Sequence, residues 1–252
     1  MIKPYVHQTL TTKALHFSMG EIQSLMDIRR PDALELDYTR VMMGFLLFVP
    51  DPATVLMIGL GGGSLAKFCH RQLPSARIVV VEINPHVIAL RKEFHVPEDS
   101  DRFRVVQADA AEFVRTCAQR CDVVLVDGFD YDGQPASLCS TPFYERCFDL
   151  LGPDGVLVVN LHAAHPDHAA HVERIADIAD GPTLLVRDED RTNAIVFARR
   201  GKAVALHAGH LQKPRQLDGV SWQSLKRPFT RILLAFGRLP DTLRPALEGF
   251  LP

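Results

Sequence analysis

The chain has 252 residues, of which 47% are hydrophobic, and its formal net charge is −2. This length and hydrophobic content suffice for one large domain with a buried core and a small appendage. The nearly balanced charge excludes a general attraction to nucleic acid or anionic membranes, and no apolar run approaches the roughly 20 residues that span a bilayer. The N-terminal residues lack the apolar core of a signal peptide, and the five cysteines form no Cys-x-x-Cys pair, so we expect a cytoplasmic protein with reduced thiols.

The N-terminal region, residues 1–50, is predicted to form a small β cap followed by a connecting helix. Residues 14–28 alternate weakly between apolar and polar side chains, which indicates one or two strands with a turn at residues 19–20. Residues 34–48 then carry apolar side chains at helical spacing, up to Pro50. We expect this helix to pack on the main sheet.

From residue 51 to residue 205, strand-like and helix-like segments alternate. The strand-like runs occupy residues 54–60, 76–83, 103–109, 121–127, 155–161, 183–188 and 194–199. The helical patterns lie near residues 64–73, 85–95, 110–118, 140–151 and 167–179, and residues 152–155 indicate a turn. This alternation predicts a doubly wound α/β domain with a seven-stranded, mostly parallel sheet covered on both faces. A short loop joins the last two strands, which could therefore form an antiparallel hairpin at the sheet edge.

A glycine-rich turn follows the first of these strands, where residues 54–64 read TVLMIGLGGGS. The apolar run ends in four glycines: Gly59, Gly61, Gly62 and Gly63. Glycines at this position let the backbone approach a ligand closely, and the first N–H groups of the next helix favour polar or anionic groups. The turn predicts a nucleotide site, although glycines that only make a tight turn would look the same. The dinucleotide motif G-x-G-x-x-G is not matched, because Ser64 stands in place of its last glycine.

Polar residues end the next four strands of the predicted sheet. They are Glu82, Asp109, Asp127 and Asn160. In an open α/β sheet, ligands bind beyond the carboxyl ends of the strands. Glu82 comes about twenty residues after the glycine turn, where an acid can accept hydrogen bonds from ribose hydroxyls. Asp109 can accept a hydrogen bond from an adenine amino group, and both acids have the alternative role of capping the following helix.

The loop after the fourth strand carries three carboxylates within six positions: Asp127, Asp130 and Asp132. A cluster of acids binds a cation well, and one member can accept a proton. Asp132 precedes Gly133 and is more typical of a turn. Asp127 and Asp130 are therefore the candidate catalytic residues.

The run VLMIGLGGGS…VVVEINP…VVQADAAEF…DVVLVDGFDYDGQPASL…FYERCFDLLGPDGVLVVN resembles the spermidine synthase (polyamine aminopropyltransferase) family over residues 54–200. That family shares the fold of S-adenosylmethionine-dependent methyltransferases, carries an N-terminal β cap and usually forms dimers or tetramers. The resemblance implies transfer of an aminopropyl group from decarboxylated S-adenosylmethionine to a small polyamine such as putrescine. It further implies a homodimer and no metal.

The resemblance also implies roles for single residues. The implied cofactor-binding residues are Gln23, Gly59, Gly61, Gly62, Gly63, Glu82 and Asp109. Within that set, Glu82 would hold the ribose and Asp109 the adenine amino group. Asp127 would accept the proton of the attacking amine, Asp130 would help to hold the aminopropyl chain, and Tyr38 would lie beside the amine.

Three positions depart from the family pattern. Gly62 stands where the family usually has an aspartate that binds the propylamine of the cofactor, and Thr39 replaces a histidine. The loop at residues 127–132 carries one extra residue before Pro135. Without the aspartate, ordinary S-adenosylmethionine is an alternative ligand. An S-adenosylmethionine-dependent methyltransferase and a non-catalytic adenosyl-nucleotide-binding protein therefore stay open as alternatives.

Two further patterns are given lesser weight. Histidines recur every three residues at His162, His165, His168 and His171, but no evident further ligand completes a metal set. Residues 206–252 are predicted to be a basic helical tail packed on the domain. Its interleaved basic and aromatic residues would also fit nucleic acid, but an amphipathic helix with its charges in water is favoured.

Overall fold

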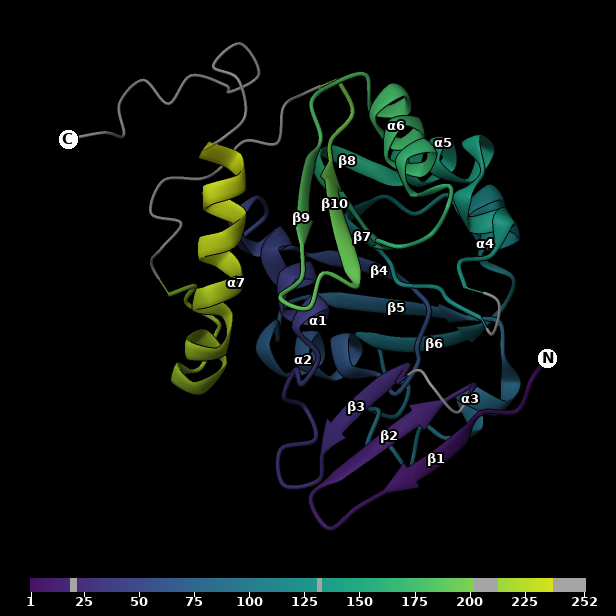
Figure 1. The fold of residues 1–252 in the computed structure, drawn as a ribbon, viewed down its shortest axis with the longest axis vertical. Coiled ribbons are helices and arrows are strands. Elements are labelled where there is room, and N and C mark those ends of the chain that lie inside the picture. Colours follow the sequence, from purple (N-terminus) through teal and green to yellow (C-terminus); the bar gives the residue numbers. More distant parts are fainter. Residues whose placement is uncertain (19–21, 131–132, 202–212, 238–252) are drawn as a thin grey trace.

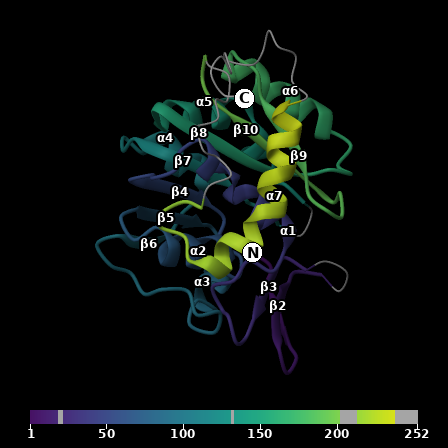
Figure 2. The same ribbon diagram turned by 90° about the vertical axis from the view of Figure 1, so that its left-hand side faces the viewer.

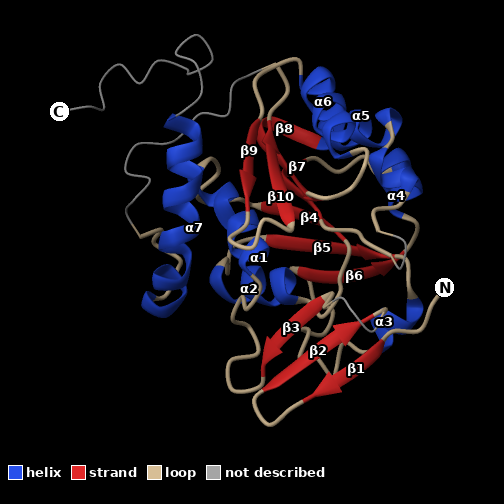
Figure 3. Cartoon of the chain, in the orientation of Figure 1, coloured by secondary structure: helices blue, strands red, loops and turns tan. Residues whose placement is uncertain are grey.

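A computed structural model of the chain describes residues 1–18, 22–130, 133–201 and 213–237. A three-stranded sheet lies beside a larger sheet that carries helices on both faces (Figures 1 and 3). Among the described residues, no helix combines the length and apolar character needed to cross a membrane. The predicted limits of the three regions, at residues 50 and 205, stay a prediction, and the predicted turn at residues 19–20 lies outside the described residues.

The larger sheet has seven strands in the order β6-β5-β4-β7-β8-β10-β9. These strands are β4 (Thr54–Ile58), β5 (Arg77–Glu82), β6 (Phe103–Gln107), β7 (Cys121–Val126), β8 (Leu151–His162), β9 (Leu184–Arg187) and β10 (Asn193–Ala198). Strands β4 to β8 pair in parallel, whereas β10 pairs antiparallel with both β8 and β9. The predicted α/β class, the mostly parallel sheet and the edge hairpin are confirmed.

Helices cover both faces of this sheet. They are α1 (Asp37–Met42), the 3-10 helix η1 (Met43–Leu47), α2 (Ser64–Gln72), α3 (Pro85–Ala89), α4 (Ala110–Thr116), the 3-10 helix η2 (Ala136–Cys139), α5 (Thr141–Leu150), α6 (His168–Ala179) and α7 (Gly219–Gly237). Successive side chains of a strand point to opposite faces, so Val55 and Met57 of β4 join the core with α1, α2 and α7. Leu56 and Ile58 join the core with α4, α5 and α6. Figure 2 shows α7 lying across the first of these faces, where it contacts α1, η1 and β9.

The cap is an antiparallel sheet of β1 (Tyr5–Gln8), β2 (Thr12–His16) and β3 (Ser24–Asp27). The prediction missed β1, because its four residues YVHQ show too little alternation to signal a strand. Residues 34–48 were predicted as one helix, but the chain forms α1 and then η1. Within η1, a Cβ atom at Gly44 would lie 2.2 Å from Cδ1 of Ile232, so any larger residue there would displace that side chain of α7.

Two other predicted boundaries differ from the structure. The turn predicted at residues 152–155 is an irregularity inside β8, since the pairing with β7 shifts from Cys121–Leu151 to Val123–Val156. The helix predicted at residues 85–95 ends at Ala89. The residues that follow α3 instead turn back toward α2, where the carbonyl of Phe94 accepts a hydrogen bond from Lys67 at 2.8 Å.

Candidate active site

A cavity of about 390 Å³ opens at the carboxyl ends of β4, β5 and β7 and is also lined by the cap. Eight of the ten predicted site residues line it: Gln23, Tyr38, Gly59, Gly61, Glu82, Asp109, Asp127 and Asp130. Residues more than one hundred positions apart in the sequence therefore share one cavity. The fold brings them together because the carboxyl ends of adjacent parallel strands meet at one edge of the sheet.

Three glycines of the turn have packing roles that the sequence did not separate from ligand binding. Gly59 has a φ of 95°, and a Cβ atom there would lie 2.2 Å from the carbonyl oxygen of Asp127. A Cβ atom at Gly62 would lie 2.6 Å from Oγ of Ser24. Gly62 and its neighbour Gly63 are not among the residues that line the cavity, and their predicted contact with the ligand stays a prediction. Gly63 packs instead against Val96.

Glu82 is buried at the end of β5 and is held by backbone donors. Its Oε2 accepts a hydrogen bond from the N–H of Leu60 at 2.9 Å, and its Oε1 accepts one from the N–H of Asn84 at 2.8 Å. Burial raises the pKa of this carboxyl, and the backbone N–H groups that face it oppose the rise. Both oxygens are thus fixed at the cavity wall and keep lone pairs for ligand hydroxyls.

Asp109 caps α4, as the alternative interpretation of the sequence expected. Its Oδ1 accepts hydrogen bonds from the N–H groups of Ala111 at 2.8 Å and Glu112 at 3.1 Å. The side chain is exposed and also lines the cavity. Because both cap bonds use Oδ1, capping and ligand binding are compatible at this residue.

Asp127 follows β7 and is held by side-chain donors. Its Oδ2 accepts a hydrogen bond from the hydroxyl of Tyr38 at 3.2 Å, and its Oδ1 accepts one from Nδ2 of Asn160 at 2.8 Å. Burial raises the pKa of Asp127, whereas the bonds from Asn160 and Tyr38 lower it. Burial and the facing carboxylate raise the pKa of Tyr38 well above its usual range, so the phenol keeps its proton. The arrangement can accept a proton at a fixed position.

Asn160 is a site residue that the sequence analysis located at a strand end without assigning a role. It is 1% exposed in β8, and only the strand-end position signalled it. Asp130, by contrast, is exposed at the cavity wall, and its backbone N–H donates to the carbonyl of Gly133 at 2.8 Å. The neighbouring Asp132, predicted to form a turn, lies outside the described residues.

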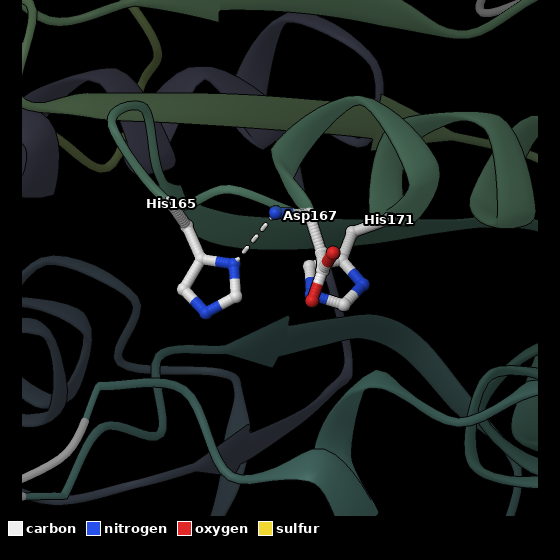
Figure 4. Close-up of side chains that lie close together, drawn as sticks. All are labelled: His165, Asp167 and His171. Atoms are coloured by element: carbon white, nitrogen blue, oxygen red, sulfur yellow. Dashed lines mark hydrogen bonds between the residues drawn. The ribbon is translucent and has the colours of Figure 1, made fainter.

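The histidine pattern brings His165, Asp167 and His171 together, with ligand atoms within 4.8 Å of one another (Figure 4). Nδ1 of His165 accepts a hydrogen bond from the N–H of Asp167 at 3.1 Å, drawn as a dashed line in Figure 4. Nδ1 of His171 lies 3.2 Å from the guanidinium of Arg174, which can only donate. Each neutral ring then carries its proton on Nε2, which does not favour a metal at that nitrogen. The absence of a metal stays a prediction.

Comparison with known proteins shows the family to which this chain belongs. Residues 35–174 match the spermine/spermidine synthase domain, and the chain belongs to that family, as the sequence resemblance indicated. It is 40% identical over 189 residues to a polyamine aminopropyltransferase of Chromobacterium violaceum, which covers 75% of this chain and 72% of the relative.

The chain is also similar to a methyltransferase in sequence and to a solved spermidine synthase in fold. The chain is 28% identical over 229 residues to the eEF1A lysine and N-terminal methyltransferase of Xenopus laevis, covering 79% of this chain and 33% of that protein. A crystal structure of a spermidine synthase in complex with the transition state analogue AdoDATO has a TM-score of 0.60 and 19% identity, covering 90% of this chain and 87% of the other. This last likeness defines the fold.

Proposed function

We propose that this protein is a transferase that moves an aminopropyl group from decarboxylated S-adenosylmethionine to a small polyamine. Family membership and the relative named polyamine aminopropyltransferase support the reaction class. The observation that carries the proposal is the Asp127 carboxylate, fixed between Tyr38 and Asn160 at the wall of the cavity.

The other side of the cavity fits an adenosyl group. Glu82 presents two fixed oxygens to ribose hydroxyls, and Asp109 keeps Oδ2 for the adenine amino group. Ile83 is 44% exposed although it is apolar, and it lines the cavity together with Leu138. The flat ring face of a purine would cover such surfaces. The AdoDATO complex of the spermidine synthase supports the same class of ligand.

The reaction follows from these positions. The amine nitrogen attacks the carbon next to the sulfonium, the N–C bond forms as the C–S bond breaks, and methylthioadenosine leaves with the electron pair. An ammonium ion has no lone pair, so the amine must lose a proton, and Asp127 accepts it. Tyr38 and Asn160 hold that carboxylate in place, and alignment of amine and carbon supplies much of the remaining rate enhancement. In this proposal Asp130, which lines the cavity, anchors the amine substrate or the aminopropyl chain.

The test is a product assay with the full chain, in which decarboxylated S-adenosylmethionine is mixed with putrescine and with longer or shorter diamines. The expected products are methylthioadenosine and the aminopropylated amine, in equal amounts. Release of S-adenosylhomocysteine from ordinary S-adenosylmethionine, with no methylthioadenosine from either donor, would contradict the proposal. The small-molecule amine and the homodimer are part of this proposal, and light scattering of the purified protein tests the dimer.

Methyl transfer is the second candidate function, and one observation favours it. Ser24 occupies the space next to Gly62, so this turn presents no carboxylate to the propylamine of a decarboxylated donor. The similarity to a methyltransferase of Xenopus laevis agrees with that alternative. The third alternative, adenosyl binding without catalysis, predicts that binding depends on Glu82 and Asp109 and that Asp127→Asn has no effect on function.

A further inference from the structure

A short N-terminal segment lies at the mouth of the cavity. We call residues 1–4 the N-terminal strap; it precedes β1 of the cap and passes beside α3 (Figure 1). Met1 and Ile2 line the cavity, although the sequence pattern gave no sign of either. At the other end of the strap, Pro4 is buried and the chain enters the cap sheet. The strap therefore connects the cap to the side of the cavity that carries Glu82.

The strap is attached to the large domain through the side chain of Asn84. Its Nδ2 donates a hydrogen bond to the carbonyl of Ile2 at 2.9 Å. Its Oδ1 accepts one from the N–H of His86 at 3.0 Å and so caps α3, while its backbone N–H donates to Glu82. Asn84 is 7% exposed, and hydrogen bonds are stronger away from water. One buried residue thus joins the strap to the carboxylate that is proposed to hold the ribose.

The strap leaves apolar surface uncovered next to the place proposed for the adenosyl group. Met1 is 72% exposed and Ile2 is 50% exposed, and Ile83, which also lines the cavity, is 44% exposed. Exposed apolar side chains that gather at one site are typical of a ligand-binding groove. A nucleoside held by Glu82 would cover this surface and release the water on it, which stabilises the complex.

We propose that the N-terminal strap closes over the nucleoside of the adenosyl ligand, and that Asn84 is the positioning residue that holds the strap there. This inference rests on the proposed adenosyl site and adds a contact to it. Glu82 ends β5 and Asn84 follows it, whereas Asp127 follows β7, and β4 lies between those two strands. The strap therefore acts on the nucleoside, and the proton transfer at Asp127 does not depend on it.

A substitution at Asn84 separates the strap from the cap of α3. Asn84→Ser keeps a side-chain oxygen for the N–H of His86 and leaves the backbone bond to Glu82, but its hydroxyl is too short to reach the carbonyl of Ile2. The unmodified chain and the variant, with no residues added before Met1, are titrated calorimetrically with methylthioadenosine. The Kd should rise about three- to tenfold in Asn84→Ser, as expected for the loss of one hydrogen bond.

A second substitution removes the apolar surface of the strap and keeps its backbone. Ile2→Gln should raise the Kd for methylthioadenosine by about threefold, because less apolar surface is buried on binding. Leu234→Gln on α7 is the matched control, since Leu234 is 58% exposed and does not line the cavity. Its Kd should equal that of the unmodified chain.

The double variant Asn84→Ser with Ile2→Gln distinguishes the strap from a general loss of stability. Once the strap is released, the side chain of Ile2 no longer contacts the nucleoside, so the combined rise in Kd should be about twofold or more below the product of the two single effects. In the product assay, the KM for the donor should rise with the Kd. The kcat and the KM for the amine should stay within about twofold of the unmodified values.

The inference and the adenosyl site fail in different ways. An unchanged Kd in Asn84→Ser, or single effects that multiply fully in the double variant, overturns the strap and leaves the adenosyl site standing. A rise in the KM for the amine that matches the rise for the donor also overturns the inference, because the strap would then act on the whole cavity. An unmodified chain that does not bind methylthioadenosine overturns the adenosyl site and the inference with it.

Discussion

Two carboxylates stand at the ends of neighbouring regions of one sheet and are held in different ways. Glu82, the last residue of β5, accepts hydrogen bonds from the backbone N–H groups of Leu60 and Asn84. Asp127, after β7, accepts its hydrogen bonds from the side chains of Tyr38 and Asn160. Backbone donors are set by the fold, whereas side-chain donors are set by the residue at each position. The position of the Glu82 carboxylate is thus fixed by the backbone, whereas the hydrogen bonds of Asp127 can be changed by substituting single side chains.

This difference in hydrogen-bond donors matches the two roles that the proposed reaction requires, which are ligand binding by Glu82 and proton acceptance by Asp127. A binding residue needs an acceptor at a fixed position, and backbone N–H groups hold the oxygens of Glu82 in place. A general base needs a proton affinity suited to the amine, and burial together with two removable donors sets it. Substitution of Asp127 should therefore reduce turnover, whereas substitution of Glu82 should weaken ligand binding.

The largest effect is expected from Asp127→Asn. The amide keeps the shape of the side chain but cannot take the proton of the amine, so turnover should fall by about a thousandfold. Titration calorimetry should find the affinity for methylthioadenosine changed by less than about twofold, because the adenosyl contacts lie elsewhere. Asp101→Asn, at an exposed loop position, is the control and should keep full turnover. Retention of more than a tenth of the turnover in Asp127→Asn would remove Asp127 as the base.

Glu82→Gln should give the opposite result. An amide has one acceptor oxygen, so its NH₂ group must face the N–H of either Leu60 or Asn84, at a cost of about 1–3 kcal/mol. The Kd for methylthioadenosine should rise about 10- to 100-fold, the melting temperature should fall, and turnover at saturating donor should change far less than in Asp127→Asn. An unchanged Kd and melting temperature would show that the backbone donors do not define this carboxylate.

Tyr38→Phe should change the pH dependence rather than abolish turnover. The hydroxyl of Tyr38 lowers the pKa of Asp127, so its removal raises that pKa further. Since the base acts only when deprotonated, the rising acid limb of the pH–rate profile should move to higher pH. Asn160→Ala should move it in the same direction and by more, because the Asn160 bond lowers the pKa more strongly. Tyr5→Phe is the control, because the hydroxyl of Tyr5 donates to the carbonyl of Ser18, away from Asp127. An unchanged acid limb of the pH–rate profile in Tyr38→Phe would show that Tyr38 does not lower the pKa of Asp127.

Much of the framework was predictable from local sequence. Continuous apolar runs such as Val55–Ile58 identify buried parallel strands, and each predicted strand of the large sheet is present. The two carboxylates were predictable as well, because a strand end is a position that sequence alone reveals. The short strand β1 and the change from α1 to η1 were not, since they depend on pairing and on the approach of α7.

The side-chain donors were harder to predict because they come from distant parts of the chain. The bond from Asn160 to Asp127 joins a residue on β8 to one that follows β7, and Ser24 reaches the glycine turn from the cap. The sequence identified Gly62 as unusual, but not that Ser24 fills the adjacent space. Such contacts depend on tertiary packing, for which local patterns carry no signal.

The smallest expected effect concerns Lys67 and the pH dependence of the free energy of unfolding. Lys67 on α2 is 3% exposed, and its ammonium donates to the carbonyl of Phe94, whose ring packs beside Gly62. Burial lowers the pKa of Lys67 from 10.5 to about 8. Between these values the unfolded chain binds more protons than the folded chain, so the free energy of unfolding rises with pH.

Lys67→Met removes this titration. The free energy of unfolding of the unmodified chain, minus that of Lys67→Met, should therefore increase as the pH rises from about 8 toward 10.5. The limiting slope is about 1.4 kcal/mol per pH unit. Urea unfolding at several pH values measures the difference, and Lys92→Met, at an exposed position, should show no such trend. A pH-independent difference would mean that Lys67 is already solvated in the folded chain. In that case the hydrogen bond from Lys67 to the carbonyl of Phe94 would not hold the ring of Phe94 against the glycine turn next to Glu82.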